Sequence, residues 1–359
     1  MAAADTAEAT RLDRLDGWPG PEERSDWLGD PATEQALLDA YRTGRMHHGW
    51  LLGGPKGIGK ATLAYRLARF VLAHPYPLAP EVAAATDLSV PADHPAARKV
   101  AARAHPNLLV LERPWREDRK RFLTELSVDE VRRTVGFFGS TSGEGGWRVA
   151  IVDSADDMNQ SAANALLKVL EEPPARSLFL LVCHAPGRLL PTIRSRTRRL
   201  DLKPLAAETV IAALAASGRD EEEAAAAAAL AEGSLRRAIQ LLDEDGIATY
   251  RAFAGLAGRL PSLDVAAMHA FAERVSRRGE DDTYFAFLDM VRAWLQRRVR
   301  GEAEPVAGVS AGPAGVPLAR WAEVWEKVEQ SSAEADDLNL DRKQVVLTIL
   351  MTLARAARM

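Results

Sequence analysis

The chain of 359 residues has very little cysteine and no excess of basic charge. Its single cysteine, Cys183, excludes an intrachain disulfide and an all-cysteine zinc site, and it favours a reducing compartment. The net charge of -4 excludes nucleic-acid binding by a generally basic chain, so such binding would need a local patch. The sequence also lacks an apolar run near the ~20 residues of a membrane span, and residues 1–5 show no secretory signal pattern. We therefore expect a cytoplasmic protein without a membrane partner.

The remaining composition is that of a globular protein, with 47% hydrophobic and 27% charged residues. A chain of this length is expected to form two or three domains. Up to residue 203, short apolar runs alternate with helix-like segments, whereas residues from 204 onward are alanine-rich and helical throughout. Alternating strands and helices predict a parallel sheet that is covered on both faces. The expected fold is an α/β module followed by an all-α region.

The clearest motif lies in residues 50–62, where an apolar run leads into a glycine-rich turn and then into a helix-forming segment. The spacing of Gly54, Gly57, Gly59 and Lys60 fits the GxxxxGK pattern of a phosphate-binding P-loop. Glycines let backbone N–H groups approach phosphate oxygens, and the start of the following helix adds positive potential. The stretch predicts a nucleotide site that takes ATP, with or without Mg²⁺.

Two groups that complete catalysis in P-loop ATPases differ here. The residue after the lysine, which supplies a magnesium-binding hydroxyl, is Ala61, and Thr62 lies about 100° further round a helix. A second apolar run, residues 147–152, ends in Asp153, where such enzymes place a metal-binding carboxylate; the alternative role is a helix N-cap. The next position, expected to carry a water-polarising glutamate, is Ser154. The sequence thus predicts a nucleotide site with weak hydrolysis.

Two other clusters invite a functional interpretation. Residues 113–121 hold five basic side chains, which could touch phosphates, but the acids among them favour an ordinary solvated loop equally. Residues 74–106 form an irregular, proline-rich stretch with three histidines, and no cysteine or ordered carboxylate spacing accompanies them. We expect solvated loop histidines and no zinc.

Several stretches, taken in order from about residue 30 to the end, resemble the AAA+ clamp-loader subunits of bacterial DNA polymerase III. The matching stretches are residues 54–60, 128–132, 153–156, 162–174, 190–196, 233–238 and 338–344. With the composition, the resemblance implies a loose arm over residues 1–25, an AAA+ nucleotide-fold domain over 26–203, a helical lid over 204–262 and a helical collar over 263–359. A Pro/Gly/Ala linker is expected at 301–317.

The resemblance implies membership of a hetero-oligomeric ring that opens a sliding clamp and places it on primed DNA. The implied partners are the other clamp-loader subunits, gamma/tau and delta, and, through the complex, the clamp and DNA. In this family the arginine matching Arg196 is an arginine finger that projects into the neighbouring subunit's ATP site, and the one matching Arg236 is a lid sensor that contacts phosphate in its own subunit. A guanidinium fork suits phosphate oxygens as charge builds during transfer. The alternative for either residue is an ordinary solvated arginine.

The sequence departs from the family at three further places. Thr197 stands where cysteine is usual, His184 is the nearest candidate for the polar sensor after the fourth strand, and the four-cysteine zinc module is absent. The loss of two catalytic groups, at Ala61 and Ser154, together with a retained Arg196 predicts a poorly active component of the polymerase III holoenzyme that completes its neighbour's site and is not itself the polymerase. One alternative is an active gamma/tau-like motor ATPase in which Thr62 replaces the missing hydroxyl. Another is a P-loop enzyme such as a nucleotide kinase, which the helical residues 205–359 disfavour.

Overall fold

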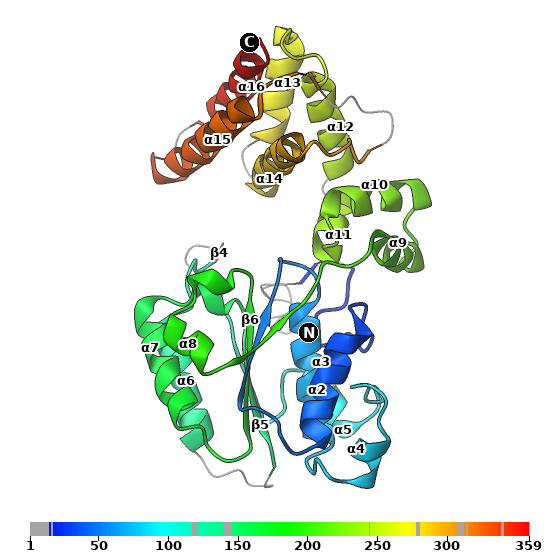
Figure 1. Cartoon of the computed structure of the whole chain (residues 1–359), viewed down its shortest axis with the longest axis vertical. Helices are drawn as coiled ribbons and strands as arrows, with labels where there is room; N and C mark the ends of the chain where they lie inside the picture. The colour runs from blue at the N-terminus through cyan, green and yellow to red at the C-terminus, as the bar shows by residue number, and fades with distance from the viewer. Residues whose placement is uncertain are drawn as a thin grey trace. The chain divides into compact units, whose positions relative to one another are not determined.

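A computed structural model shows the chain as two compact units, and each is described by itself (Figure 1). One unit comprises residues 1–206 with 234–236, and the other comprises residues 207–233 with 237–359. The structure describes residues 14–15, 17–116, 121–139, 146–243, 245–277, 281–306, 312–313, 315–338 and 341–358.

The first unit is built on a parallel sheet whose five strands run in the order β2-β5-β6-β1-β7. The strands are β1 (Gly49–Gly53), β2 (Leu108–Leu111), β5 (Arg148–Val152), β6 (Ser177–Cys183) and β7 (Arg198–Asp201). The central strands β1 and β6 are buried along their whole length, as expected for apolar runs with helices on both faces. The edge strand β7 is largely exposed. The predicted α/β module, followed by helical regions, is confirmed.

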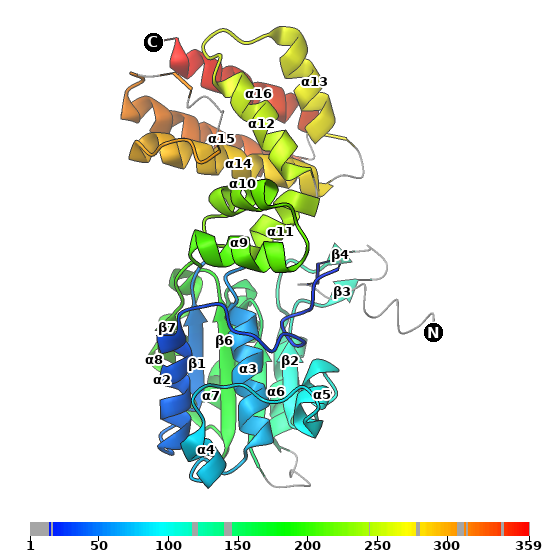
Figure 2. The ribbon, with the colours of Figure 1, turned by 90° about the vertical axis from the view of Figure 1, so that its right-hand side faces the viewer.

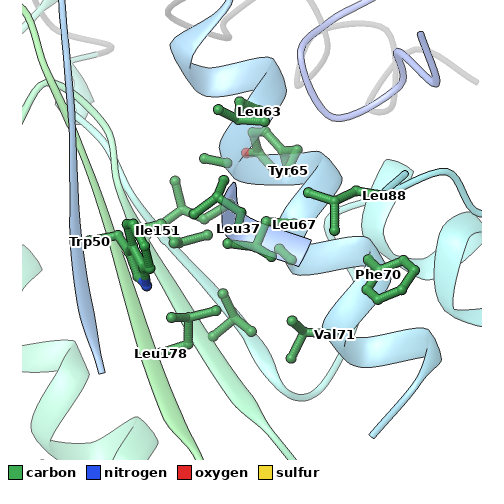
Figure 3. Packing of buried hydrophobic residues seen from close by; sticks show 14 of the residues in the cluster. Leu37, Trp50, Leu63, Tyr65, Leu67, Phe70, Val71, Leu88, Ile151 and Leu178 are labelled. Carbon is green, nitrogen blue, oxygen red and sulfur yellow. The ribbon is translucent and has the colours of Figure 1, made fainter. Parts of the chain in front are cut away.

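Helices cover both faces of this sheet (Figures 1 and 2). One face carries α2 (Pro31–Arg42), α3 (Lys60–Ala73), α4 (Pro80–Ala84) and α5 (Pro95–Ala101), and the other carries α6 (Val128–Gly139), α7 (Gln160–Glu171) and α8 (Pro191–Ser195). On the first face, Leu63, Leu67 and Val71 of α3 pack toward Trp50 and Ile151 of the sheet (Figure 3). Burial of such side chains contributes roughly 1.5–3 kcal/mol each. This packing fixes the direction of α3 and hence of the loop before it.

The stretch 74–106 is more ordered than its prolines indicate, so the prediction of an irregular segment is wrong there. Helices α4 and α5 each begin at a proline, which is preorganised for the first helical position and lacks only an N–H that would be unpaired anyway. The ring of His94 caps α5 by accepting the N–H of Ala96 at 3.1 Å. A short antiparallel hairpin follows β2, formed by β3 (Trp115–Arg116) and β4 (Arg121–Phe122).

The arm predicted over residues 1–25 lies partly outside the described residues, and its described end lies on α3. Arg69 donates to the carbonyls of Arg24 at 3.0 Å and Glu22 at 2.7 Å. The carboxylate of Glu22 is buried and forms an ion pair with Arg103 at 3.2 Å. These contacts hold residues 22–24 against α3. They also give the buried charge of Glu22 the partner that a buried charge needs.

The second unit is helical in its described part. Its helices are α9 (Ala207–Ala216), α10 (Glu221–Ala231), α11 (Leu235–Asp243), α12 (Gly246–Ala257), α13 (Val265–Val275), α14 (Asp281–Arg300), α15 (Leu318–Leu338) and α16 (Arg342–Ala357). An aromatic core of Phe253, Phe287, Trp294 and Trp321 joins three of them, α12, α14 and α15. Its division into a lid and a collar, with the linker at 301–317, stays a prediction. Among the described helices, none is long and apolar enough to cross a membrane.

Candidate nucleotide site

The loop between β1 and α3 has the backbone that the P-loop motif requires. Gly54, Gly57 and Gly59 adopt φ values of 140°, 79° and 96°, a region that side chains other than glycine rarely occupy. Gly59 is the N-cap of α3, which begins at Lys60. The first N–H groups of the helix therefore face the loop, where they could bind an anion together with the helix dipole.

Lys60 lies inside the loop rather than on the surface. Its side chain is buried, and Nζ donates to the carbonyl oxygens of Gly54 at 2.7 Å and Pro55 at 2.5 Å. These charge-assisted bonds hold the ammonium group within the curve of the loop. This is where the motif places a lysine that meets the outer phosphates of a nucleotide.

Two glycines of the loop are required by close packing as well as by φ. A Cβ on Gly54 would lie 2.7 Å from the carbonyl oxygen of Leu202, just after β7. A Cβ on Gly57 would lie 2.2 Å from Oγ of Ser234 and 2.7 Å from Cβ of Arg236. The loop thus fits between the end of β7 and residues 234–236, which belong to the same compact unit.

The predicted sensor Arg236 is brought to the loop by this packing. Its backbone N–H donates to the carbonyl of Gly57 at 3.4 Å, at the start of α11. The backbone of Arg236 therefore contacts the loop that holds Lys60, and its role as a sensor stays a prediction. Sequence reasoning missed Trp27, whose ring lies 3.4 Å from a Cβ built on Gly59. Trp27 is distant from the loop in the chain, and no motif spacing links the two.

The carboxyl ends of β5 and β6 lie at the same edge of the sheet as the P-loop, because β5, β6 and β1 are parallel neighbours. Asp153 follows β5 and is buried, and its N–H donates to Leu111 at 2.8 Å. Ser154 follows in a left-handed conformation with φ 54°, and its hydroxyl lies 3.4 Å from Nε2 of His184, which follows β6. The edge thus holds the predicted metal carboxylate and the candidate sensor.

Asp156 links these two strand ends, a role that the sequence did not reveal. Its carboxylate accepts the backbone N–H groups of His184 at 2.9 Å and Ala185 at 3.0 Å. Burial alone would raise the pKa of Asp156, but these hydrogen bonds outweigh it and hold the pKa below its ordinary value. Burial likewise raises the pKa of the neighbouring Cys183 thiol to about 12, so this cysteine is unsuited to nucleophilic chemistry.

Arg196 lies away from this edge. It precedes β7, and its carbonyl oxygen is 3.4 Å from a Cβ built on Gly49, the first residue of β1. Gly49 is five residues before Gly54, which at ~3.3 Å per residue is about 16 Å along the strand. An arginine side chain does not span that distance. The structure therefore does not bring Arg196 to the P-loop of its own chain.

The other predicted positions lie as follows. Thr62 is on the first turn of α3, one residue beyond Ala61, which packs against the core. The hydroxyl of Thr197 donates to the carbonyl of Ile193 at 3.0 Å, so it stabilises the end of α8. Residues 113–121 are described in part: Arg113 pairs with Asp157 at 3.5 Å, whereas residues 117–120 lie outside the described residues.

Of the two side chains that the motif offers a divalent metal, only one carries an oxygen. Asp153 has its carboxylate, whereas Ala61 has no oxygen on its side chain. Among the residues that the structure describes, no three His, Cys, Asp or Glu side chains gather into a metal site. The expectation of no zinc stays a prediction.

A parallel five-stranded sheet with a glycine loop and buried lysine after its strand β1, followed by helices, defines the class as a P-loop protein. Residues 29–206 match the family described as "DNA polymerase III, delta subunit". The resemblance to subunits of bacterial DNA polymerase III is thereby confirmed.

Individual relatives agree with this family. The chain is 40% identical over 164 residues to DNA polymerase III subunit delta' of Pseudomonas aeruginosa, covering 45% of each protein. It is 28% identical over 271 residues to subunit tau of Salmonella typhimurium, covering 71% of this chain and 39% of that protein. A solved gamma-subunit-related protein of Thermotoga maritima superposes with a TM-score of 0.44 at 16% identity, covering 90% of this chain and 100% of that one. The matched region spans less than half the length of the two curated relatives.

Proposed function

We propose that the chain is a delta-prime-type subunit of a DNA polymerase III clamp loader, and that it helps to place a sliding clamp on primed DNA. In this role it assembles with gamma/tau and delta subunits and lends Arg196 to the ATP site of a neighbouring subunit. It is a component of the holoenzyme and not the polymerase. The family match over residues 29–206 and the delta' relatives support this proposal.

The observation that carries the proposal is the separation of Arg196 from the P-loop of its own chain. Arg196 lies beside Gly49 at the amino end of β1, whereas Lys60 lies beyond its carboxyl end. A guanidinium that serves phosphoryl transfer from this position must act on a nucleotide held by another protomer. Such a contact in trans makes hydrolysis depend on assembly.

The pocket of the chain itself binds ATP but hydrolyses it poorly in this proposal. Gly54, Gly57, Gly59 and Lys60 cradle the phosphates, and Arg236 approaches them from the start of α11. Bound Mg²⁺ would neutralise charge on the phosphate oxygens, and Asp153 is the side chain placed to contact it. Ala61 offers the metal no hydroxyl, and Ser154 offers the attacking water no carboxylate. Each loss removes positioning on which phosphoryl transfer depends.

The decisive experiment compares Arg196→Ala with Arg194→Ala in the loader reconstituted with its gamma/tau and delta subunits. Arg194 is the matched control, because it is exposed on the same short helix, two residues earlier. An arginine finger is worth about 10³–10⁵ in rate at the site it serves. We expect the single-turnover burst to lose the amplitude of one site in Arg196→Ala and to be unchanged in Arg194→Ala. An unchanged burst in Arg196→Ala would refute the trans role.

A second candidate is an active motor subunit of the gamma/tau type. It is favoured by the tau relative, which aligns over 71% of this chain, and by a P-loop that keeps its glycines and lysine. In that case Thr62 would replace the missing hydroxyl. DNA-stimulated ATP turnover by the isolated chain, abolished by Thr62→Ala, would support the motor and displace the first proposal.

A further inference from the structure

The guanidinium of Arg196 is held by two partners on neighbouring elements. Nη1 donates to the carbonyl oxygen of Thr192 at 3.1 Å, and Nη2 lies 2.8 Å from Oε1 of Glu171. Thr192 belongs to α8, and Glu171 is the last residue of α7, which packs beside α8 (Figure 1). The side chain is thus fixed from two directions rather than extended into solvent.

The surroundings of Arg196 are otherwise strongly basic. Arg194, Arg198 and Arg199 are all exposed and lie within three residues of it. Arg199 pairs with Asp201, and Arg198 lies over the ring of Trp50 at 5.0 Å. Like charges repel one another and would move a long, flexible side chain away from this cluster. The carboxylate of Glu171 is the negative charge that faces Arg196 and opposes this repulsion.

We infer that Glu171 is a positioning residue that sets the Arg196 fork in the orientation needed to meet a neighbour's nucleotide. This inference rests on the proposed function in trans. A guanidinium has five N–H donors, and the two contacts leave others available for phosphate oxygens. The Arg196 side chain remains 36% exposed, so the group is held without being covered. Because most of the rotamer freedom of arginine is removed before binding, less ordering is required when the subunits meet.

The opposite interpretation is that Glu171 holds Arg196 away from the neighbour, so that the ion pair must break first. The two interpretations predict opposite effects for Glu171→Gln, which removes the charge and keeps the size of the side chain. Positioning predicts a lower kcat for ATP turnover of the reconstituted loader, by about two- to fivefold given the small energies of half-exposed ion pairs. The KM for ATP should change less than twofold, because the fork acts on charge that builds in the transition state.

The matched control is Glu172→Gln, since Glu172 is also exposed and is the adjacent residue. We expect it to behave as wild type. A double variant with Arg196→Ala tests whether Glu171 acts through the arginine: once the arginine is gone, Glu171→Gln should lower kcat no further. A structural role for Glu171 would instead lower kcat on both backgrounds.

The outcomes separate this inference from the proposal beneath it. If Arg196→Ala leaves the loader unaffected, the proposed function is wrong. If Arg196→Ala lowers turnover and Glu171→Gln leaves kcat unchanged, lowers it on both backgrounds or raises it, only the positioning role is wrong. A lower kcat in Glu171→Gln that disappears on the Arg196→Ala background supports it.

Discussion

Replacing Gly57 by alanine is the sharpest test of the nucleotide loop. The new Cβ would lie 2.2 Å from Oγ of Ser234 and 2.7 Å from Cβ of Arg236, at a φ of 79°. The backbone conformation alone costs about 1–2 kcal/mol for a residue other than glycine. The contact with Ser234 must also be relieved, which displaces either the loop or residues 234–236. Because Gly57 lies in the middle of the loop, its displacement misdirects the N–H groups that would face phosphate.

The magnitude follows from the hydrogen bonds that would be lost. One charge-assisted N–H contact to phosphate contributes about 1.5–3 kcal/mol, which corresponds to roughly 10- to 150-fold in Kd. We expect isothermal titration of ATP into Gly57→Ala to show at least this loss of affinity. Gly44→Ala is the control, because Gly44 has a similar φ of 68° and a Cβ there meets nothing within 4 Å.

Gly44→Ala should lose only stability and keep the wild-type Kd for ATP. Equal Kd values for wild type and Gly57→Ala would show that the loop does not cradle the nucleotide. If the wild-type chain binds no ATP, alone or in the assembled loader, the proposal of a nucleotide site is wrong.

Three further predictions concern the elements around the site. Arg66→Met breaks an almost fully buried ion pair with Glu34 at 2.5 Å, and we expect urea denaturation to show a loss of about 3–5 kcal/mol in the free energy of unfolding. The control Arg42→Met breaks a half-exposed pair with Asp39 and should lose less than about 1 kcal/mol. Asp156 has a folded pKa below the ordinary 3.8, which its backbone hydrogen bonds lower against the effect of burial. It therefore stabilises the fold above that pH, and the difference in unfolding free energy from Asp156→Asn should disappear as the pH falls through the lowered pKa. The buried Cys183, with a pKa of about 12, should resist a thiol reagent at pH 8 until the protein is unfolded.

The sheet and its helices could be predicted from the sequence because each element carries a local signal. The apolar runs that became β1 and β6 are buried at every position, and the Asn159 N-cap marks the start of α7 by accepting the N–H of Ala162 at 2.9 Å. Helices α4 and α5 fall in the stretch 74–106, which its prolines predict to be irregular. At the first helical position a proline instead favours the helix.

The contacts that surround the candidate site had no local signal. Ser234 meets Gly57 across 177 positions of sequence, and only the fold brings them together. The same holds for Glu22, which Arg69 and Arg103 hold against the rest of the first unit although its flanking sequence is polar. Each of these contacts joins a single pair of residues that are far apart in the chain and belong to no repeated pattern. Neither periodicity nor motif spacing therefore predicts that the two residues meet.

The two altered positions of the pocket and the candidate finger lie on different elements of the first unit. Ala61 is on α3 and packs with the core on one face of the sheet, whereas Glu171 ends α7 and Arg196 is the C-cap of α8 on the other face. A substitution at residue 61 therefore leaves the contacts of Arg196 with Thr192 and Glu171 intact. Loss of hydrolysis in the chain's own pocket and retention of a finger for a neighbour are mechanically independent in this fold. Under the proposed function, this independence lets a subunit lose its own catalysis while catalysis by the next subunit still depends on its arginine.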